Sequence, residues 1–115
     1  MILLTTKISL QELEHIEPTT YFDGWIKCVA DLDRELLAVN ASMHADLEEY
    51  LLSQGSEQKN LYGFNILFDP FEIEYDSIIN APRNRADGFP RDGRGVSSPT
   101  ARKKIEEIIH KWVNC

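Results

Sequence analysis

The sequence has few of the residues from which redox and metal sites are built. Its only cysteines, Cys28 and Cys115, fit no C-x-x-C spacing of the kind that redox and zinc sites use. The three histidines, His15, His44 and His110, are scattered, and none forms H-x-x-x-H or H-E-x-x-H. We therefore expect no disulfide framework, no metal site and no bound cofactor.

Long apolar runs are also missing. No stretch approaches the roughly 18 apolar residues of a membrane span, and the apolar segment at residues 1–4 is too short for a signal peptide. With 115 residues, 43% hydrophobic and 27% charged, the chain has the size and composition of one globular domain. We expect a single-domain cytoplasmic protein with no membrane-spanning segment.

Positive charge is scarce in most of the chain and is gathered near its end. Residues 1–80 hold 4 Lys or Arg against 15 Asp or Glu, a balance of −11, whereas residues 81–115 hold 8 against 4, a balance of +4. The net charge of −7 disfavours an extended nucleic-acid face, because such a face needs many cations. A local arginine patch is still able to hold one or two phosphates. The alternative is that the basic residues 81–115 simply pack on the acidic residues 1–80.

Residues 61–80 are the segment around which the expected fold is organised. They predict two strands, 61–68 and 72–79, with a turn at Asp69-Pro70-Phe71, because proline presets the backbone of a turn. Apolar and polar side chains alternate along the second strand, which is typical of a strand with one face buried and one face in water.

A second hairpin is predicted earlier in the chain. It joins strands at residues 25–32 and 35–40 through Asp33-Arg34, a pair that lacks the glycine preferred in a type I′ turn. In the first of these strands, Trp25, Lys27, Val29 and Asp31 share one face. Residues 2–4 are long enough to add a short edge strand.

Two helices are predicted before the second pair of strands. Ser9 and Glu12 form a capping box for a short helix over residues 10–16. Ser42 is expected to cap a second helix over residues 43–53, and Gly55 supplies the left-handed backbone that ends it.

The last helix is predicted over residues 99–113. Ser98 is its expected cap and Pro99 stands in its first turn, where a missing N–H costs nothing. Its apolar residues fall at the spacing i, i+3, i+4, i+7 and i+8, which indicates one buried stripe.

These elements together predict an α+β fold. The expected sheet has four antiparallel strands in β-β-α-β-β order, with an N-terminal and a C-terminal helix packed on it. The helices are placed on one face of the sheet, so one core is expected to hold Leu51, Ile66, Ile109 and Trp112. The expected parts of the single domain are an N-terminal helix segment at 1–24, a ββαββ core at 25–80, an irregular Arg/Gly loop at 81–98 and the closing helix at 99–113.

The loop over residues 81–98 is the predicted anion site. Guanidinium groups bind phosphate and carboxylate through paired hydrogen bonds, and glycines let backbone N–H groups approach an anion. The candidate residues are Arg83, Arg85, Arg94 and Gly95. Arg94 and Gly95 come shortly before the N-terminus of the closing helix, whose dipole favours negative charge. The competing interpretation is a loop that is solvated or paired within the chain.

Three residues are candidate acid–base groups: His44, Asp46 and Asp76. His44 lies in the first turn of its predicted helix, where the dipole disfavours the charged imidazolium and lowers the pKa. The alternative role for His44 is a hydrogen bond to a neighbouring strand.

Polar residues at the end of the second predicted hairpin are candidate supports for the site: Asn65, Ser77 and Asn80. In the functional interpretation they form a polar floor beneath the arginine loop. In the structural interpretation Asp76 is the counter-charge of Arg83 or Arg85 and orders the loop.

The chain resembles a family of small bacterial and archaeal proteins of unknown function, common in cyanobacteria. The segments that carry the resemblance are HADLE at 44–48, GS at 55–56, LYGFN at 61–65, DSIIN at 76–80 and RGV at 94–96. The resemblance covers nearly the whole chain. It implies a single domain of these limits, and it implies no activity.

Two functions of different classes are compatible with these observations. The first is a non-enzymatic binding or assembly module, expected as a homodimer that uses a sheet edge or the acidic face. The second is a small enzyme acting on a phosphorylated or nucleotide substrate held by the arginine loop. The position of His44 relative to Arg94 separates them, because the enzyme loses its base if the two lie on opposite sides of the molecule.

Overall fold

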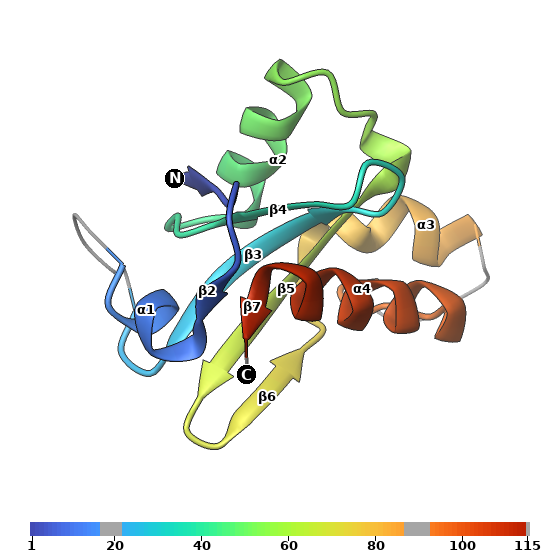
Figure 1. Ribbon diagram of the computed structural model, residues 1–115. Coiled ribbons are helices and arrows are strands. Elements are labelled where there is room, and N and C mark those ends of the chain that lie inside the picture. Colours follow the sequence, from blue (N-terminus) through green and yellow to red (C-terminus); the bar gives the residue numbers. More distant parts are fainter. Residues whose placement is uncertain (17–21, 87–92, 115) are drawn as a thin grey trace.

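The computed structural model describes residues 1–16, 22–86 and 93–114 (Figure 1). Residues 87–92 of the arginine loop and Cys115 lie outside the described residues, as does the side chain of Arg83.

The fold is α+β and is built on one antiparallel sheet, as predicted. In spatial order its strands are β1 (Ile2–Leu3), β4 (Leu36–Val39), β3 (Trp25–Asp31), β5 (Leu61–Phe68) and β6 (Phe71–Glu74). The predicted number of four strands was wrong, because β1 pairs with β4 and adds a fifth strand at that edge. A separate parallel pair, β2 (Ile8–Ser9) with β7 (Val113–Asn114), joins the two ends of the chain.

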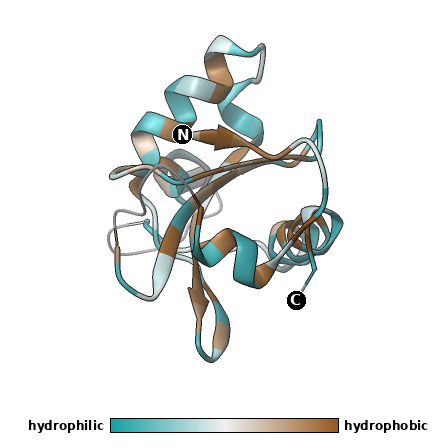
Figure 2. Cartoon of the chain, turned by 60° about the vertical axis from the view of Figure 1, so that its left-hand side comes forward, coloured by the Kyte–Doolittle hydropathy of each residue, from teal (hydrophilic) through white to brown (hydrophobic). Residues whose placement is uncertain are grey.

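Helices cover both faces of the sheet. Helix α1 (Leu10–Glu14) and helix α4 (Pro99–Trp112) pack on one face, whereas helix α2 (His44–Ser53) packs on the other (Figure 1). Figure 2 shows the sheet between them as mostly brown, hydrophobic ribbon. The central strand β5 is buried along most of its length, because neighbours cover it on both sides.

The prediction of one common core was therefore wrong. Ile66 and Ile109 lie in the cluster between the sheet and α4, but Leu51 belongs to the second cluster beneath α2. Trp112 is only partly buried at the edge of the first cluster. Alternating side chains on β5 point to opposite faces, and the pattern of a single strand does not show which face a given helix covers.

The β3–β4 hairpin is confirmed, and Asp31 explains how it turns without glycine. One carboxylate oxygen of the buried Asp31 accepts hydrogen bonds from the backbone N–H groups of Asp33 and Arg34, both at 2.9 Å. The other accepts from the hydroxyl of Ser56 at 2.7 Å. Glu35 takes the left-handed conformation that the reversal requires, with φ of 56°.

The helix ends follow most of the predicted signals. Ser9 and Glu12 exchange both bonds of a capping box, each at 3.0 Å, and Ser98 accepts from the N–H of Ala101. Gly55 is left-handed, with φ of 96°, and ends α2 as predicted. The predicted cap Ser42 was wrong, since α2 begins one residue later and has Met43 in the cap position.

The segment after the second hairpin differs most from prediction. Strand β6 ends at Glu74 and not at Ile79, and a 3-10 turn, η2 (Ile78–Asn80), leads into a short helix, α3 (Ala81–Ala86). The prediction of no regular structure in 81–98 was therefore wrong for its first six residues. Ser77 accepts a hydrogen bond from the N–H of Ile79 and so caps η2.

Candidate functional site

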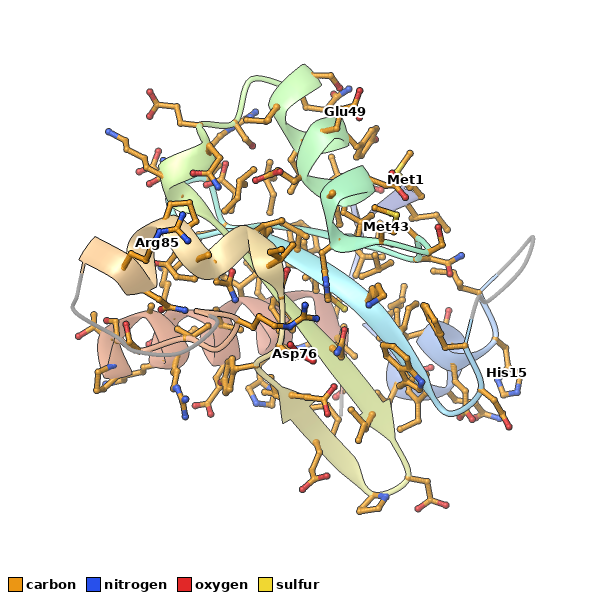
Figure 3. The ribbon with its side chains drawn as sticks, turned by 180° about the vertical axis from the view of Figure 1, so that it is seen from behind. Met1, His15, Met43, Glu49, Asp76 and Arg85 are labelled. Carbon is orange, nitrogen blue, oxygen red and sulfur yellow. The ribbon has the colours of Figure 1, made fainter. Side chains whose placement is uncertain are left out.

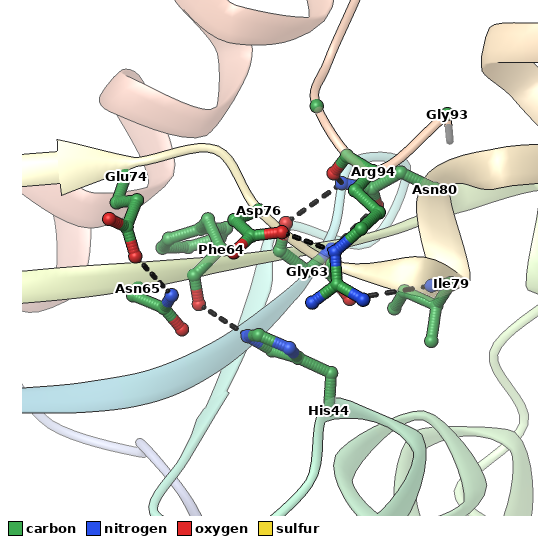
Figure 4. Close-up of polar contacts among 12 residues, drawn as sticks. His44, Gly63, Phe64, Asn65, Glu74, Asp76, Ile79, Asn80, Gly93 and Arg94 are labelled. Carbon is green, nitrogen blue, oxygen red and sulfur yellow. Dashed lines mark hydrogen bonds and ion pairs between the residues drawn. The ribbon is translucent and has the colours of Figure 1, made fainter. Parts of the chain in front are cut away.

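A pocket of about 160 Å³ lies where β3, the start of α2, η2 and the Arg94 loop meet. It is lined by Lys27, Ser42, Met43, His44, Ala45, Ile78 and Arg94. Figure 4 shows the polar contacts beside it. His44 and Arg94 thus share one pocket, which is the arrangement on which the enzymatic interpretation depended.

Gly63 on β5 makes room for this site. A Cβ atom at Gly63 would stand 2.6 Å from Cβ of Ser77 and 3.2 Å from Cδ2 of His44. Real Cβ atoms do not approach a Cβ so closely, so any side chain here displaces Ser77. The missing side chain lets both Ser77 and His44 lie directly against the strand.

Asn80 continues the sheet where β6 has ended. Its side-chain amide donates to the carbonyl of Gly63 and accepts from the N–H of Gly63, both at 2.9 Å. The amide therefore pairs with β5 as a neighbouring peptide group would. This buried contact explains why the last predicted strand stops early, since a side chain replaces its backbone.

Arg94 is held by its backbone as well as by its side chain. Its carbonyl accepts from the N–H of Ser77 at 2.7 Å and from the amide of Asn80 at 3.3 Å. Two of the predicted supporting residues thus position the arginine, and they do so from beneath it as buried groups.

Asn84 orders the rest of this loop, and the sequence analysis missed it. Its buried amide donates to the carbonyls of Gly93, at 2.6 Å, and Gly95, and its oxygen accepts from the N–H of Ser97 at 3.0 Å. No local pattern marks this asparagine, because its partners lie nine to thirteen residues further along the chain.

Asp76 is the counter-charge of Arg94. Nε of Arg94 lies 2.6 Å from Oδ1 of Asp76, and the two side chains are 44% and 45% exposed. The sequence interpretation gave Asp76 an arginine partner but named Arg83 or Arg85. Because both groups are near water, the pair is worth about 0–1 kcal/mol.

His44 is buried against β5 and points one ring edge at the pocket. Its Nε2 lies 2.9 Å from the carbonyl oxygen of Phe64, and since a carbonyl only accepts, Nε2 carries the proton and donates. Burial lowers the pKa of His44, the Phe64 carbonyl opposes that shift, and the positive charge of Lys27 adds to it. The ring is therefore neutral near pH 7, with a lone pair on Nδ1. The predicted direction was right, but burial is the main cause rather than the helix dipole.

Lys27 is the cation that the sequence analysis did not select. It lies on β3 opposite Asn65, with Nζ 5.0 Å from the ring centre of Trp25 and 5.2 Å from that of Phe22. Among the described residues no carboxylate lies within ion-pair distance of it. The signal was available in the alternation of β3, which placed Lys27 and Trp25 on one face.

Asn65 lies next to Lys27 in the sheet, as a buried polar group. Its amide donates to the carboxylate of Glu74 at 2.8 Å, and its Oδ1 accepts no hydrogen bond from any part of the chain that the structure describes. A row of polar side chains thus crosses β3, β5 and β6 below the pocket.

The remaining candidates lie apart from this pocket. Asp46 lines a different, wider hollow of about 400 Å³ beside Met1, Glu49 and Tyr50. Arg85 lies on α3, away from Asp76, as the view from behind the molecule in Figure 3 shows. Gly95 is held by Asn84 and does not line the pocket. Among the arginines whose side chains the structure describes, Arg94 lines the pocket and Arg34, Arg85 and Arg102 do not, so these four do not converge.

Metal-binding and membrane-spanning features are absent from residues 1–16, 22–86 and 93–114. Within these ranges no three His, Cys, Asp or Glu side chains stand close enough together to hold a metal ion. None of the helices there is both long and apolar enough to cross a membrane.

The chain belongs to the protein family of unknown function DUF5674, whose model matches residues 2–112. This match agrees with the resemblance to an uncharacterised family seen in the sequence. No curated protein and no solved structure matches the chain.

Proposed function

We propose that this DUF5674 protein is a non-enzymatic binding module whose ligand places a phosphate or carboxylate group in the pocket between Lys27, His44 and Arg94. The observation that carries the proposal is the meeting of two cations and a neutral imidazole from three separate elements. Lys27 has no carboxylate partner among the described residues, so an anion there gains a charge partner rather than competing for one.

The start of α2 supports the same ligand. The helix has ten residues, its first turn lines the pocket, and no side chain caps it. The N–H groups of an uncapped first turn attract anions, and the helix dipole adds to that attraction. His44 stays neutral there and is able to accept a hydrogen bond from a protonated oxygen of the ligand.

The volume of the pocket limits the size of the group that binds in it. Sites for drug-sized ligands enclose about 300–1,000 Å³, so a pocket of about 160 Å³ fits one anionic group rather than a whole ligand. An extended nucleic-acid backbone is disfavoured, because the chain has a net charge of −7.

Thermal unfolding in rising concentrations of inorganic phosphate and sulfate tests the proposal. At 100 times Kd a ligand stabilises the fold by about 2.7 kcal/mol, a melting shift of roughly ten degrees. Lys27→Gln should remove most of the shift, whereas Lys103→Gln, on the exposed face of α4, should keep it. An equal shift in both variants, or none in the unmodified protein, would refute an anion site at Lys27.

A second candidate function is a small enzyme acting on a phosphorylated ligand. One observation favours it, namely that the lone-pair nitrogen of His44 belongs to a ring lining the same pocket as Arg94. The other acid–base candidates do not join His44, since Asp46 lies in another hollow and Asp76 pairs with Arg94. Phosphate release from phosphate esters that is lost in His44→Gln would establish the enzyme; binding without turnover would establish the module.

The assembly part of the proposal is a homodimer through the edge of β1. The opposite edge, β6, carries exposed Glu72 and Glu74, and charges of this kind protect an edge strand from pairing. At the β1 end two large apolar side chains are exposed: Met1 is 56% and Met43 is 55% exposed, and both lie beside α2 (Figure 3).

A further inference from the structure

In the part of the chain that the structure describes, no helix covers the end of the sheet's α2 face that carries Trp25 and Leu67. Helix α2 covers the half that contains Val29 and Leu61, which are fully buried. Beyond it Trp25 and Leu67, which are neighbours on β3 and β5, are only partly buried. Together with Glu74 they line a second pocket of about 290 Å³.

This second pocket adjoins the anion pocket. Trp25 and Lys27 are two residues apart on β3, so their side chains leave the same face about 7 Å from each other. The ammonium group of Lys27 lies 5.0 Å from the centre of the Trp25 ring, and Lys27 also lines the anion pocket. One cation thus connects an aromatic surface to an anion-binding surface.

The aromatic side chains are held in place before any ligand arrives. The rings of Phe22 and Trp25 are stacked, with centroids 4.0 Å apart and planes 23° from parallel. Nζ of Lys27 is 5.0 Å and 5.2 Å from the two ring centres, so it lies beside the stacked pair and interacts with both rings. Phe22 covers one face of Trp25, so a flat ring of a ligand has the opposite face on which to stack, and a tryptophan already held by its neighbours offers that face at little entropic cost.

From this arrangement we infer that the ligand is an aromatic ring joined through a sugar-sized linker to a phosphate, as in a mononucleotide. The phosphate lies between Lys27 and Arg94, and the ring lies against Trp25 and Leu67. The inference rests on the proposed function, because it takes the anion pocket as the phosphate site.

Charge sets the direction in which such a ligand lies. Glu74 lines the Trp25 pocket, and its carboxylate repels a phosphate at that end while accepting N–H donors from the edge of a base. Lys27 and Arg94 attract the phosphate at the other end. Guanine presents two neighbouring N–H donors on one edge, which makes guanosine monophosphate the sharpest probe.

The unmodified protein provides the first test, with titration calorimetry against four compounds: inorganic phosphate, ribose 5-phosphate, guanosine and guanosine monophosphate. Stacking of a base on an aromatic side chain is worth about 1–3 kcal/mol, so the nucleotide should bind at least roughly fivefold more tightly than ribose 5-phosphate. Equal affinities for these two would overturn the inference and leave the anion site intact. Absence of binding by every phosphate compound would instead overturn the proposed function.

Substitutions then locate the ring. Trp25→Leu should reduce the affinity for guanosine monophosphate to that for ribose 5-phosphate while leaving phosphate binding unchanged. The matched control is Trp112→Phe, because Trp112 packs on the other face of the sheet. Quenching of tryptophan fluorescence by the nucleotide should persist in Trp112→Phe and vanish in Trp25→Leu. Quenching that persists in Trp25→Leu would overturn the placement.

Discussion

The side chain of Asn80 forms two hydrogen bonds with the backbone of Gly63, one to its N–H and one to its carbonyl. This contact replaces a strand pair at the point where β6 has ended, and it brings the segment that carries Arg94 against β5. The site therefore depends on Gly63, where no side chain fits, and on Asn80, whose side-chain amide pairs with β5 as the peptide group of a neighbouring strand would.

We predict that Gly63→Ala destabilises the protein by about 1–3 kcal/mol, because the new methyl group overlaps Ser77 and crowds His44. Chemical denaturation measures the effect. Adding Ser77→Gly should recover part of the loss, since Ser77 supplies the closest atoms. A double variant no more stable than Gly63→Ala alone would show that the crowding arises elsewhere.

Arg94→Ala should change the ligand-free melting temperature little and remove most of the phosphate-induced shift. Its ion pair with Asp76 is half exposed, so its loss costs about 0–1 kcal/mol. Asn84→Ala is the contrast, since it removes three hydrogen bonds that order residues 93–97 and should cost about 2–3 kcal/mol. A strongly destabilised Arg94→Ala that ligands leave unaffected would identify the arginine as a structural clamp.

The link between Glu35 and α4 should make stability depend on pH. Hydrogen bonds from Lys104 and Lys111 lower the pKa of Glu35 below its ordinary 4.5, and Glu35 raises the pKa of Lys104 above its ordinary 10.5. Because the pKa of Glu35 is lower in the folded state than in the unfolded state, its contribution to stability is fully present above the unfolded-state pKa. That contribution is lost as pH falls through the folded-state pKa. Because the pKa of Lys104 is higher in the folded state, its contribution to stability is fully present below pH 10.5. That contribution is lost as pH rises through the folded-state pKa. Glu35→Gln should therefore lower stability at neutral pH, and its difference from the unmodified protein should shrink as pH falls below 4.5. A difference that stays constant with pH would contradict the linkage.

Trp112→Ala should cost about 2–3 kcal/mol, less than the 3–5 kcal/mol of a fully buried tryptophan, because the side chain is only partly buried. Trp112→Phe should cost about 1 kcal/mol, since it retains a ring but loses the 2.8 Å hydrogen bond from Nε1 to the carbonyl of Glu35. An unperturbed Trp112→Ala protein would contradict the packing of α4 on the β3–β4 hairpin.

Light scattering at micromolar concentration should give twice the 13.2 kDa mass of one chain, if the β1 edge pairs with that of a second copy. Met43→Glu should then give the monomer, because it places added negative charge beside the acidic α2 of both copies. A mass of 13.2 kDa for the unmodified protein would dispose of the dimer.

Much of the fold was predictable because its signals are local. The capping box of Ser9, the cap at Ser98 and the left-handed Gly55 each involve residues within five positions of one another. At the end of the second hairpin, where the prediction was wrong, a contact between residues far apart in the sequence decided the outcome. The alternation over 72–79 indicated a full strand, yet Asn80 takes the place of its second half.

The candidate site divides in the same way. Residue chemistry alone pointed to His44, Arg94 and Asp76, since imidazole, guanidinium and carboxylate groups are recognisable singly. Lys27 was not predicted as a site residue, because a single lysine on a strand is common and its neighbours in the fold were not known. Asn84 was not predicted as part of the site, because its hydrogen-bond partners lie in another segment of the chain.

The sequence by itself determined the composition of the domain, the positions of α1, α2 and α4 and the hairpins, because these depend on periodicity and on hydrogen bonds between near neighbours. Only the tertiary structure decided that α2 and α4 lie on opposite faces, and that Lys27, His44 and Arg94 meet. The reason is that both faces of the central strands carry buried apolar residues, so neither face is marked for one particular helix. Which helix covers which face depends on how the whole chain packs, and that packing also leaves Trp25 at the surface beside the anion pocket.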